Sequence, residues 1–398
     1  MRIMNTLHRY LVASCITLNW FAADAHAAET STTPVNIRHM KRTVVAIPEQ
    51  NPDYGKLFDE FDAGFNSGKG LAEITNEEAF LAWWQSYLML GYIQRYRATD
   101  DAAWLAKVAD QFETLLAHRD DRTGRVDTYT STSLKGWGTT QFERCGAPWH
   151  VYIVHTGMIC LAPAELLREL KQKPALAAHI KNGPLIRKAL EECIADADQY
   201  WREGPGEGEG HYVDPCMGLL PMNQSNAMGM TLLEMYHVTG NQDYKSKVEK
   251  LATFFKNRLR TDDPQVFDWG YWPKDDAGQA SDSEDISHAA INVEFAVRCA
   301  QANIVFTRAD TERFAQTWLL KVRQGDGRWA GSVNGVAKMD YRYMPQAMGR
   351  WLPLMPELPE KLAGELYNNV ESAFAGTSIT QPSVALGVSH LALYGKNE

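Results

Sequence analysis

Residues 281–300 read SDSEDISHAAINVEFAVRCA and change from polar and acidic to apolar at His288. Asp285 and Ser287 have short polar side chains of the kind that satisfy the unpaired amides at the start of a helix. The apolar positions that follow leave no polar face of any width, which predicts a helix buried on all sides. A histidine in the first turn of such a helix either lies on the floor of a site or helps to cap the helix.

Helical periodicity runs through the rest of the chain, whereas period-two alternation is scarce. We therefore expect an all-α protein. The predicted helices span residues 54–65, 77–97, 102–118, 149–170, 184–201, 224–238, 242–259, 286–306, 310–322, 343–354, 359–374 and 384–394.

Two segments of the chain repeat each other. Residues 96–108 (YRATDDAAWLAKV) and 236–248 (YHVTGNQDYKSKV) align without gaps, with an aromatic residue shared at Trp104 and Tyr244. A fainter third copy begins at 306–310. Each copy ends one helix, turns through a short polar loop and starts an amphipathic helix. Such self-similarity indicates stacked helical hairpins that bury their faces against their neighbours.

The two helices of each hairpin differ in composition. Segments 149–170, 224–238 and 286–306 are rich in Gly, Ala, Met and other apolar residues, as an inner ring needs for close packing. Segments 102–118 and 242–259 carry Lys, Glu and Asp on one side, as an outer ring facing water would. About six such hairpins, or seven, predict an (α/α) toroid over residues 53–398. An open superhelical solenoid is the alternative.

The first residues have the pattern of a secretory signal peptide. Arg2 and Arg9 supply the positive end, residues 10–23 the apolar segment, and residues 25–27 an A-x-A cleavage site. We therefore expect a signal peptide over 1–27, an extended arm over 28–52 and a periplasmic or secreted protein. The alternative is a lipoprotein that is cleaved before Cys15.

Composition limits the classes of partner. The formal charge of -9 gives no long-range attraction for nucleic acid, and no apolar run after the leader approaches the roughly 20 residues of a spanning helix. The chain has no HExxH motif, no Cys/His cluster at ligand spacing and no glycine-rich loop after a strand, so we expect neither a metal nor a cofactor. Five cysteines follow the leader and allow a disulfide, but the sequence names neither the pairing nor the oligomeric state.

Loops that enter the inner helices of a toroid emerge on one face, around the central funnel. Here residues 122–149, 204–226, 268–288 and 329–350 concentrate aromatic, basic and amide side chains. Aromatic rings bind sugars, and Arg, Lys and Asn hold carboxylates and hydroxyls, although many of these aromatics could instead pack the loops onto the ring. The candidate substrate-binding residues are Tyr129, Trp137, Arg144, Trp149, His155, Asn223, Gln224, Trp272, Lys338 and Tyr341. For His155, a core position is the alternative.

Three short motifs stand in order at the starts of successive predicted inner helices: NQSN at 223–226, DISH at 285–288 and YRY at 341–343. In the order of these motifs the chain resembles the toroidal polysaccharide lyases that cleave alginate or polyglucuronate. The resemblance in architecture extends over most of the chain. That family places a carboxylate-neutralising amide, a histidine and a tyrosine on successive inner-helix mouths. The resemblance implies a lyase with an anionic polysaccharide as its partner and, as catalytic residues, Asn226, His288, Arg342 and Tyr343.

The chemistry explains these residue types. Elimination from a uronic acid removes the C5 proton beside the carboxylate and expels the oxygen at C4, so an amide such as Asn226 or Gln224 must first stabilise the developing charge on the carboxylate. Tyr343 is the expected acid, and the base as well in a syn elimination. Its ordinary pKa of about 10 requires a nearby cation, from Arg342 or His288. His288 could itself be the base on the other face, and Tyr341 competes for the role of Tyr343.

Three other functions remain open from the sequence. A toroidal glycoside hydrolase needs two carboxylates at the mouth, and Glu143, Asp214, Glu284, Asp285 and Asp340 are available. A uronyl epimerase would share the proton abstraction without shortening the polymer. A non-catalytic carbohydrate-binding protein would bind the polymer and turn none of it over.

Overall fold

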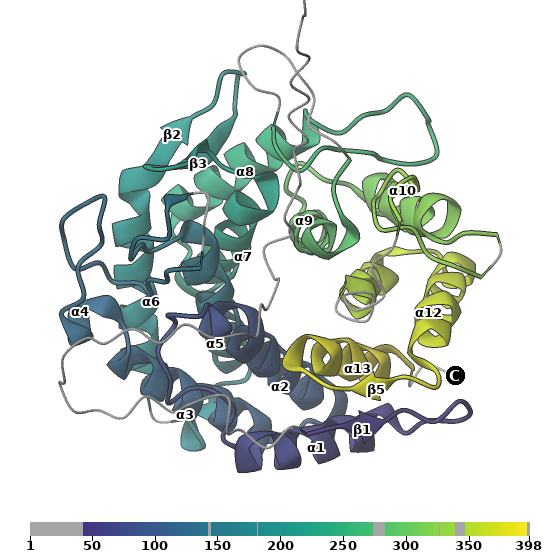
Figure 1. Ribbon diagram of the computed structural model, residues 1–398, viewed down its shortest axis with the longest axis horizontal. Helices are drawn as coiled ribbons and strands as arrows, with labels where there is room; N and C mark the ends of the chain where they lie inside the picture. Colours follow the sequence, from purple (N-terminus) through teal and green to yellow (C-terminus); the bar gives the residue numbers. More distant parts are fainter. Residues whose placement is uncertain are drawn as a thin grey trace, which may run out of the picture.

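The computed structural model describes residues 43–141, 145–180, 182–273, 283–325, 327–338 and 347–395. Two concentric rings of helices dominate it (Figure 1). The outer elements are α1 (Tyr54–Gly64), α3 (Ala102–Ala117), α6 (Gly183–Ala197), α8 (Gln242–Lys256), α10 (Arg308–Thr317) and α12 (Glu360–Phe374). The inner elements are α2 (Ser86–Thr99), α5 (Ile153–Gln172), α7 (Met222–Thr239), α9 (Ile286–Gln301), the 3-10 helix η8 (Gly349–Glu357) and α13 (Pro382–Tyr394).

The inner ring closes on itself. Each inner element contacts the next one along the chain, and the last, α13, packs against the first, α2. Outer and inner elements alternate, which makes six hairpins in the described part of the chain. The predicted all-α toroid is confirmed, and the open solenoid is wrong because its two ends would not meet.

Shorter elements connect the hairpins. They are η2 (Phe65–Gly68), η3 (Leu81–Gln85), α4 (Asp120–Thr123), η5 (Pro174–Ala178), η6 (Asp198–Tyr200) and η7 (Trp318–Val322), with strands β1 (Val45–Ala46), β2 (Trp201–Glu203), β3 (Gly210–Asp214), β4 (Gly218–Leu219) and β5 (Ser378–Ile379). β1 pairs with β5 at the start of the toroid, so this part of the predicted arm is held in place; the predicted leader lies outside the described residues.

The repeated segments form equivalent turns. Asp100 and Gly240 end their helices in the left-handed conformation, with φ of 58° and 76°, and each donates its N–H to a tyrosine carbonyl four residues earlier at 2.7 Å. Asp101 and Asn241 then cap the next helices. The third echo differs, because α9 ends at Gln301 and a capping box at residues 307–310 starts α10.

Several predicted boundaries shift at the loops. The helix predicted over 149–170 begins only at Ile153, and the one predicted to reach Trp201 ends at Ala197. Trp201 instead begins a three-stranded antiparallel sheet, β2-β3-β4, whose second and third strands lie in the predicted loop 204–226. These strands have two to five residues, too few for alternation to be recognised in the sequence.

Small residues let inner helices approach closely. A Cβ on Gly157 of α5 would lie 2.6 Å from the backbone nitrogen of Met228 in α7, and one on Gly349 of η8 would lie 2.1 Å from the Cα of Gly387 in α13. Both distances are shorter than non-bonded atoms allow. The glycines therefore set the diameter of the ring where these helices meet.

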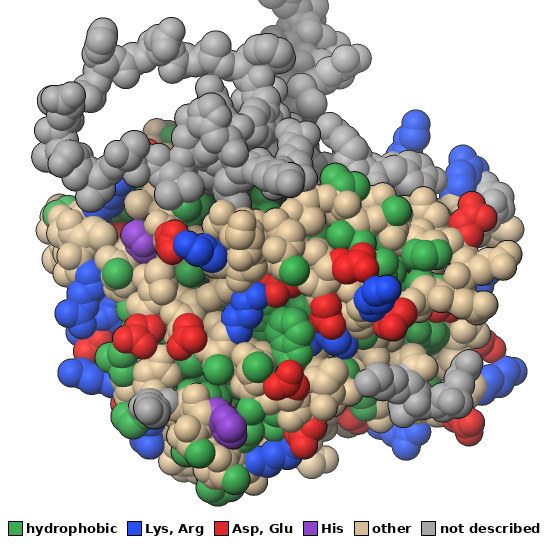
Figure 2. All heavy atoms as spheres, turned by 90° about the horizontal axis from the view of Figure 1, so that it is seen from below, with side chains coloured by type: hydrophobic (Ala, Val, Ile, Leu, Met, Phe, Trp, Pro, Cys, Tyr) green, Lys and Arg blue, Asp and Glu red, His purple; other side chains and the backbone are tan. Residues whose placement is uncertain are grey.

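A buried network of charges lies inside the ring, between the inner helices. Arg298 of α9 binds Glu165 of α5 at 2.6 Å, Glu234 of α7 at 2.9 Å and Glu294 of α9 at 2.7 Å. Arg350 binds Glu294 at 2.9 Å. These ion pairs link α5, α7, α9 and η8 inside the ring. On the side of the molecule in Figure 2, by contrast, acidic and basic side chains are interspersed over the surface.

Candidate functional site

Two neighbouring inner helices, α7 and α9, begin on the face of the long loops. The carboxylate of Asp285 caps α9: its Oδ1 accepts hydrogen bonds from the backbone N–H of Ser287 at 3.0 Å and of His288 at 3.2 Å. Its Oδ2 contacts Nδ1 of His288. The side chains of Asp285 and His288 are 43% and 28% exposed. The imidazole therefore lies in the first turn of α9, where Asp285 and not His288 caps the helix. A role of His288 in a site stays a prediction.

The electrostatics of this turn favour a charged imidazole. Burial by itself would lower the pKa of His288, but the carboxylate of Asp285 outweighs it and raises that pKa above its usual value. Burial would raise the pKa of Asp285, and the contact with His288 and the hydroxyl of Ser287 lower it well below the usual range. Because Asp285 occupies Nδ1, Nε2 of His288 is the nitrogen available to a ligand.

A chain of hydrogen bonds joins α9 to α7 behind the histidine. Asn226 of α7 donates from Nδ2 to Oδ1 of Asn292 at 2.7 Å, and Asn292 donates from its own Nδ2 to Oε2 of Glu284 at 2.7 Å. The indole N–H of Trp269 donates to the same oxygen. Asn292 lies four residues after His288 and so shares its helix face. The structure thus links Asn226 to the helix that carries His288, in one sector of the ring; Asn226 itself is buried, with 2% of its surface exposed.

Tyr271 also belongs to this sector, although the sequence analysis did not select it. Its ring centre lies 4.9 Å from that of His288 and 5.5 Å from that of Trp272. Its carbonyl accepts a hydrogen bond from the N–H of Met222 at 3.3 Å, which ties the loop to the start of α7. The aromatic run at 269–272, directly before the acidic stretch, was the available signal.

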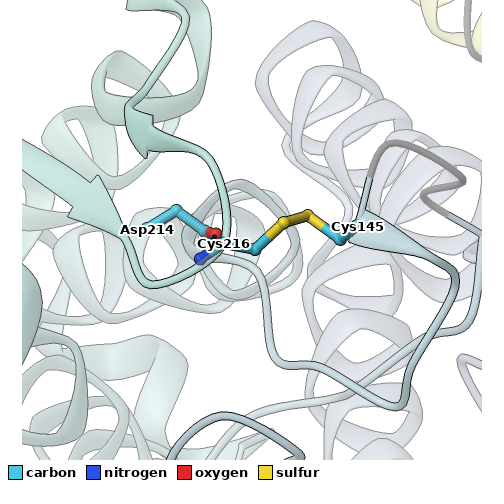
Figure 3. Close-up of side chains that lie close together, drawn as sticks. All are labelled: Cys145, Asp214 and Cys216. Atoms are coloured by element: carbon cyan, nitrogen blue, oxygen red, sulfur yellow. Dashed lines mark hydrogen bonds between the residues drawn. A yellow bond between two sulfur atoms is a disulfide. The ribbon is translucent and has the colours of Figure 1, made fainter.

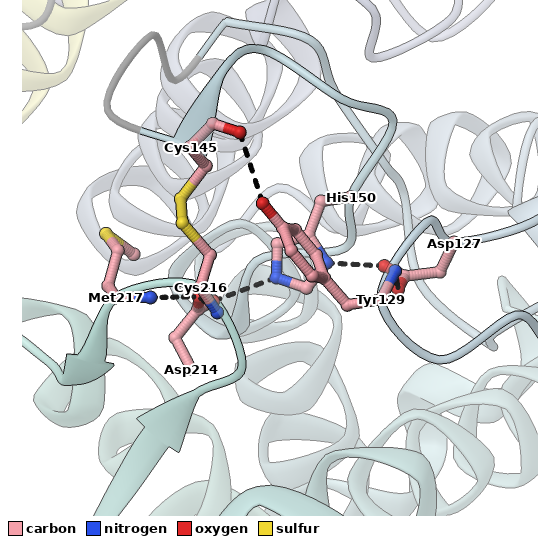
Figure 4. The surroundings of a disulfide bond; sticks show 7 residues. All are labelled: Asp127, Tyr129, Cys145, His150, Asp214, Cys216 and Met217. Atoms are coloured by element: carbon pink, nitrogen blue, oxygen red, sulfur yellow. Dashed lines mark hydrogen bonds and ion pairs between the residues drawn. A yellow bond between two sulfur atoms is a disulfide. The ribbon is translucent and has the colours of Figure 1, made fainter.

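A second polar cluster lies beside the start of α5, and its central residue was not predicted. His150 is fully buried between two carboxylates, with Nδ1 2.5 Å from Asp127 and Nε2 2.8 Å from Asp214 (Figure 4). Burial would lower the pKa of His150, but the two aspartates raise it to about 9. Because both ring nitrogens of His150 are bound to aspartates, neither can exchange a proton with a substrate. The cluster instead has a structural role: it joins the loop before α5 to the β3–β4 hairpin.

A disulfide between Cys145 and Cys216 makes the same connection (Figure 3). The oxygen of Asp214 and both sulfurs lie within 4.8 Å of one another, the one grouping of metal-ligand type found among the described residues. Because the two sulfurs are bonded to each other, neither is a thiolate ligand. The three other cysteines after the leader, Cys160, Cys193 and Cys299, are free and buried.

The aromatic residues predicted to bind substrate near α5 make contacts within the protein. Trp137 is fully buried and donates its indole N–H to the carbonyl of Leu115 at 2.9 Å, so the prediction that it contacts substrate is wrong. Trp149 donates to Asp120 at 2.7 Å, and the guanidinium of Arg125 covers one face of its ring at 4.0 Å.

His155 and Tyr129 have structural contacts. His155 is fully buried, with Nδ1 3.1 Å from Nδ2 of Asn76, and burial lowers its pKa to about 3; this corresponds to the core alternative and contradicts direct substrate contact. Tyr129 is 38% exposed, and its hydroxyl donates to the carbonyl of Cys145 at 3.1 Å.

The remaining predicted residues divide between the rim and the undescribed segments. Asn223 and Gln224 lie in the first turn of α7 and are buried, and their side-chain carbonyl oxygens have no hydrogen-bond partner within the described ranges. Lys338 is exposed and bridges to Ala330, in a loop whose Ser332 pairs with Asp285. Arg144, Tyr341, Arg342 and Tyr343 lie outside the described residues. Within the described ranges, no helix is long and apolar enough to cross a membrane.

Comparison with known proteins gives a shared fold. No family model matches the chain, and no curated protein matches it. Among solved structures, the GH76A alpha-1,6-mannanase from Salegentibacter sp. HEL1_6 has 14% identity over 86% of this chain and 98% of its own, with a TM-score of 0.53. The Lin0763 protein from Listeria innocua has 12% identity over 86% and 96%, with a TM-score of 0.55. A sugar epimerase from a ruminal bacterium has 10% identity over 80% and 88%, with a TM-score of 0.52. The chain therefore has the toroidal fold that these proteins share.

Proposed function

We propose that this protein is a carbohydrate-active enzyme, and more specifically a lyase that cleaves a polyuronate by β-elimination. The observation that carries the proposal is the sector at the starts of α7 and α9, where an amide, Asn226, is hydrogen-bonded to the helix that presents His288. The mannanase and the sugar epimerase of the same fold act on sugars, which supports a carbohydrate substrate; by their names they are a hydrolase and an epimerase, so they favour these two alternatives over the lyase.

The proposed reaction assigns each group one task. The amide N–H of Asn226 that is not bound to Asn292 donates to the uronate carboxylate, and the imidazolium of His288 adds positive charge beside it. A base removes the C5 proton, the C5–H electron pair forms the C4–C5 double bond, and the C4–O bond breaks. The leaving oxygen takes a proton from an acid. Tyr343, expected to serve as acid and base, would be assisted by Arg342; both lie outside the described residues.

A glycoside hydrolase is the second candidate, because Glu284 and Asp285 are adjacent carboxyl groups with opposite pKa shifts at the mouth of α9. Against this candidate, Glu284 has no exposed surface and its Oε2 already accepts two hydrogen bonds. A general acid has to reach the glycosidic oxygen. The second carboxylate, Asp285, is engaged by His288.

The test is incubation with alginate, polyguluronate, polymannuronate and polyglucuronate, followed by ultraviolet absorbance for the unsaturated product. A lyase increases both absorbance and reducing ends, a hydrolase increases only reducing ends, an epimerase increases neither, and a binding protein leaves the polymer unchanged. We expect His288→Ala and Asn226→Ala each to lower turnover by on the order of 100-fold with unchanged circular dichroism. The control is His179→Ala, an exposed histidine. Wild-type release of saturated products alone would refute the lyase.

We also propose that the protein is exported. The Cys145–Cys216 disulfide is of a kind that persists in oxidising compartments, in keeping with the predicted leader. Expression with residues 1–27 present, followed by mass measurement of the periplasmic or secreted product, tests this; a product that keeps the leader would contradict it.

A further inference from the structure

Two adjacent carboxyl groups at the mouth of α9 point to different surroundings. Asp285 is partly exposed and contacts His288, whereas Glu284 is completely buried. The backbone fixes this division: the N–H of Glu284 donates to the carbonyl of Trp269 at 2.9 Å, and its own carbonyl accepts from the N–H of Val333 at 3.0 Å. The side chain of Glu284 therefore extends into the protein, behind the histidine rather than beside it.

The hydrogen bonds of Glu284 impose an orientation on two amides. An indole N–H can only donate, so Oε2 of Glu284 acts as an acceptor for Trp269. The structure places Nδ2 of Asn292 on the same oxygen as a second donor, which leaves Oδ1 of Asn292 facing α7. Asn226 can satisfy that oxygen only with its own Nδ2. Glu284 thus decides, two side chains away, which end of the Asn226 amide faces α9.

The surroundings of Glu284 also affect its charge. Burial raises the pKa of Glu284 well above its usual range, and the neighbouring Asp285 carboxylate raises it further. Its other oxygen, Oε1, is buried and has no hydrogen-bond partner among the residues that the structure describes. A neutral acid tolerates that position far better than a carboxylate does. A neutral group also adds no negative charge near the place where a uronate carboxylate would bind.

We propose that Glu284 is a positioning residue which, through its hydrogen bonds with Trp269 and Asn292, holds the Asn226 amide with its nitrogen on the α9 side, where the substrate carboxylate would bind. The inference rests on the proposed function, because it takes Asn226 as the group that meets the carboxylate. Glu284 itself touches no substrate. Two adjacent residues would then position the two groups of the site: Asp285 binds the imidazole of His288, and Glu284 orients the amide of Asn226 through Asn292.

The test compares Glu284→Gln with Glu284→Leu. Glutamine can accept both hydrogen bonds with its carbonyl oxygen and place an uncharged NH2 where Oε1 lies, so kcat should stay within about threefold of the wild type. Leucine removes the acceptor, and kcat should fall by on the order of 100-fold, with KM changing much less. The pH profile of Glu284→Gln should match that of the wild type, because a neutral acid contributes no titration. A Leu variant with wild-type kcat, or a Gln variant as impaired as Leu, would overturn the proposal.

Two further variants keep the proposal testable if the first comparison fails. If Glu284→Leu does not fold, Asn292→Ala removes the link and leaves the contact between Trp269 and Glu284, and the same loss of kcat is expected. If the wild type makes no unsaturated product from any polyuronate, the lyase proposal fails. The coupling between Glu284 and Asn226 is then measured by urea unfolding. The midpoint shifts of Glu284→Leu and Asn226→Ala should be non-additive in the double variant. Additive shifts would show that Glu284 does not act on Asn226.

Discussion

The buried Asp127–His150–Asp214 cluster makes a prediction about stability and pH that does not depend on the enzymatic function. The pKa of His150 rises from an ordinary 6.5 to about 9 in the folded protein. A raised histidine pKa contributes stability that is fully present below the unfolded value and is lost as the pH rises through the folded value. The loss therefore falls between about pH 6.5 and 9, and not in acid.

The size of the effect follows from the shift. One pKa unit corresponds to about 1.4 kcal/mol, so the step from 6.5 to about 9 amounts to roughly 3 kcal/mol of unfolding free energy. No discount for solvent screening is needed, because His150 and Asp127 have no exposed side-chain surface and Asp214 has 2%. A contribution of this size is a large fraction of the stability of an ordinary domain.

The assay is urea unfolding at pH values from 6 to 9.5, without reductant, on the wild type and on His150→Gln. The glutamine variant should be less stable at pH 6, and the difference between the two proteins should shrink by roughly 3 kcal/mol by pH 9.5. Since both proteins keep His288, the titration of that residue cancels from the difference. His179→Gln, at an exposed position, should follow the wild type throughout. A difference that stays constant across this range would refute the assignment of a charged His150.

Two other predictions concern the neighbouring structure. Replacing Cys145 and Cys216 together by serine opens a loop of sequence separation 71, and loop entropy predicts a loss of about 4 kcal/mol in urea unfolding; an unchanged midpoint would contradict it. Asp285→Asn keeps a side-chain oxygen for the cap, so stability should change by less than about 1 kcal/mol. The same change removes the charge that raises the pKa of His288, and the alkaline limb of kcat/KM should move to lower pH. A limb that does not move would show that His288 is not the titrating group.

Local sequence patterns were sufficient to predict the ring of helices and the first turn of α9. Helix periodicity and capping depend on residues within a few positions of one another, so the alternation of outer and inner helices could be predicted from the sequence. The same holds for the cap formed by Asp285 and for the equivalent turns at Asp100 and Gly240. Because consecutive inner helices begin on one face, the positions of Asn226 and His288 at helix starts also predicted that they would meet.

Only the tertiary structure decided which side chains are buried and with which partners. His150 lies between two carboxylates that are 23 and 64 residues away in the sequence. Trp137 was predicted to contact a sugar, but its indole is buried in the core. Glu284 and Asp285 are chemically alike and adjacent in the sequence. Packing alone leaves Asp285 partly exposed beside His288 and places Glu284 against Trp269 and Asn292, and this difference in surroundings shifts their pKa values in opposite directions.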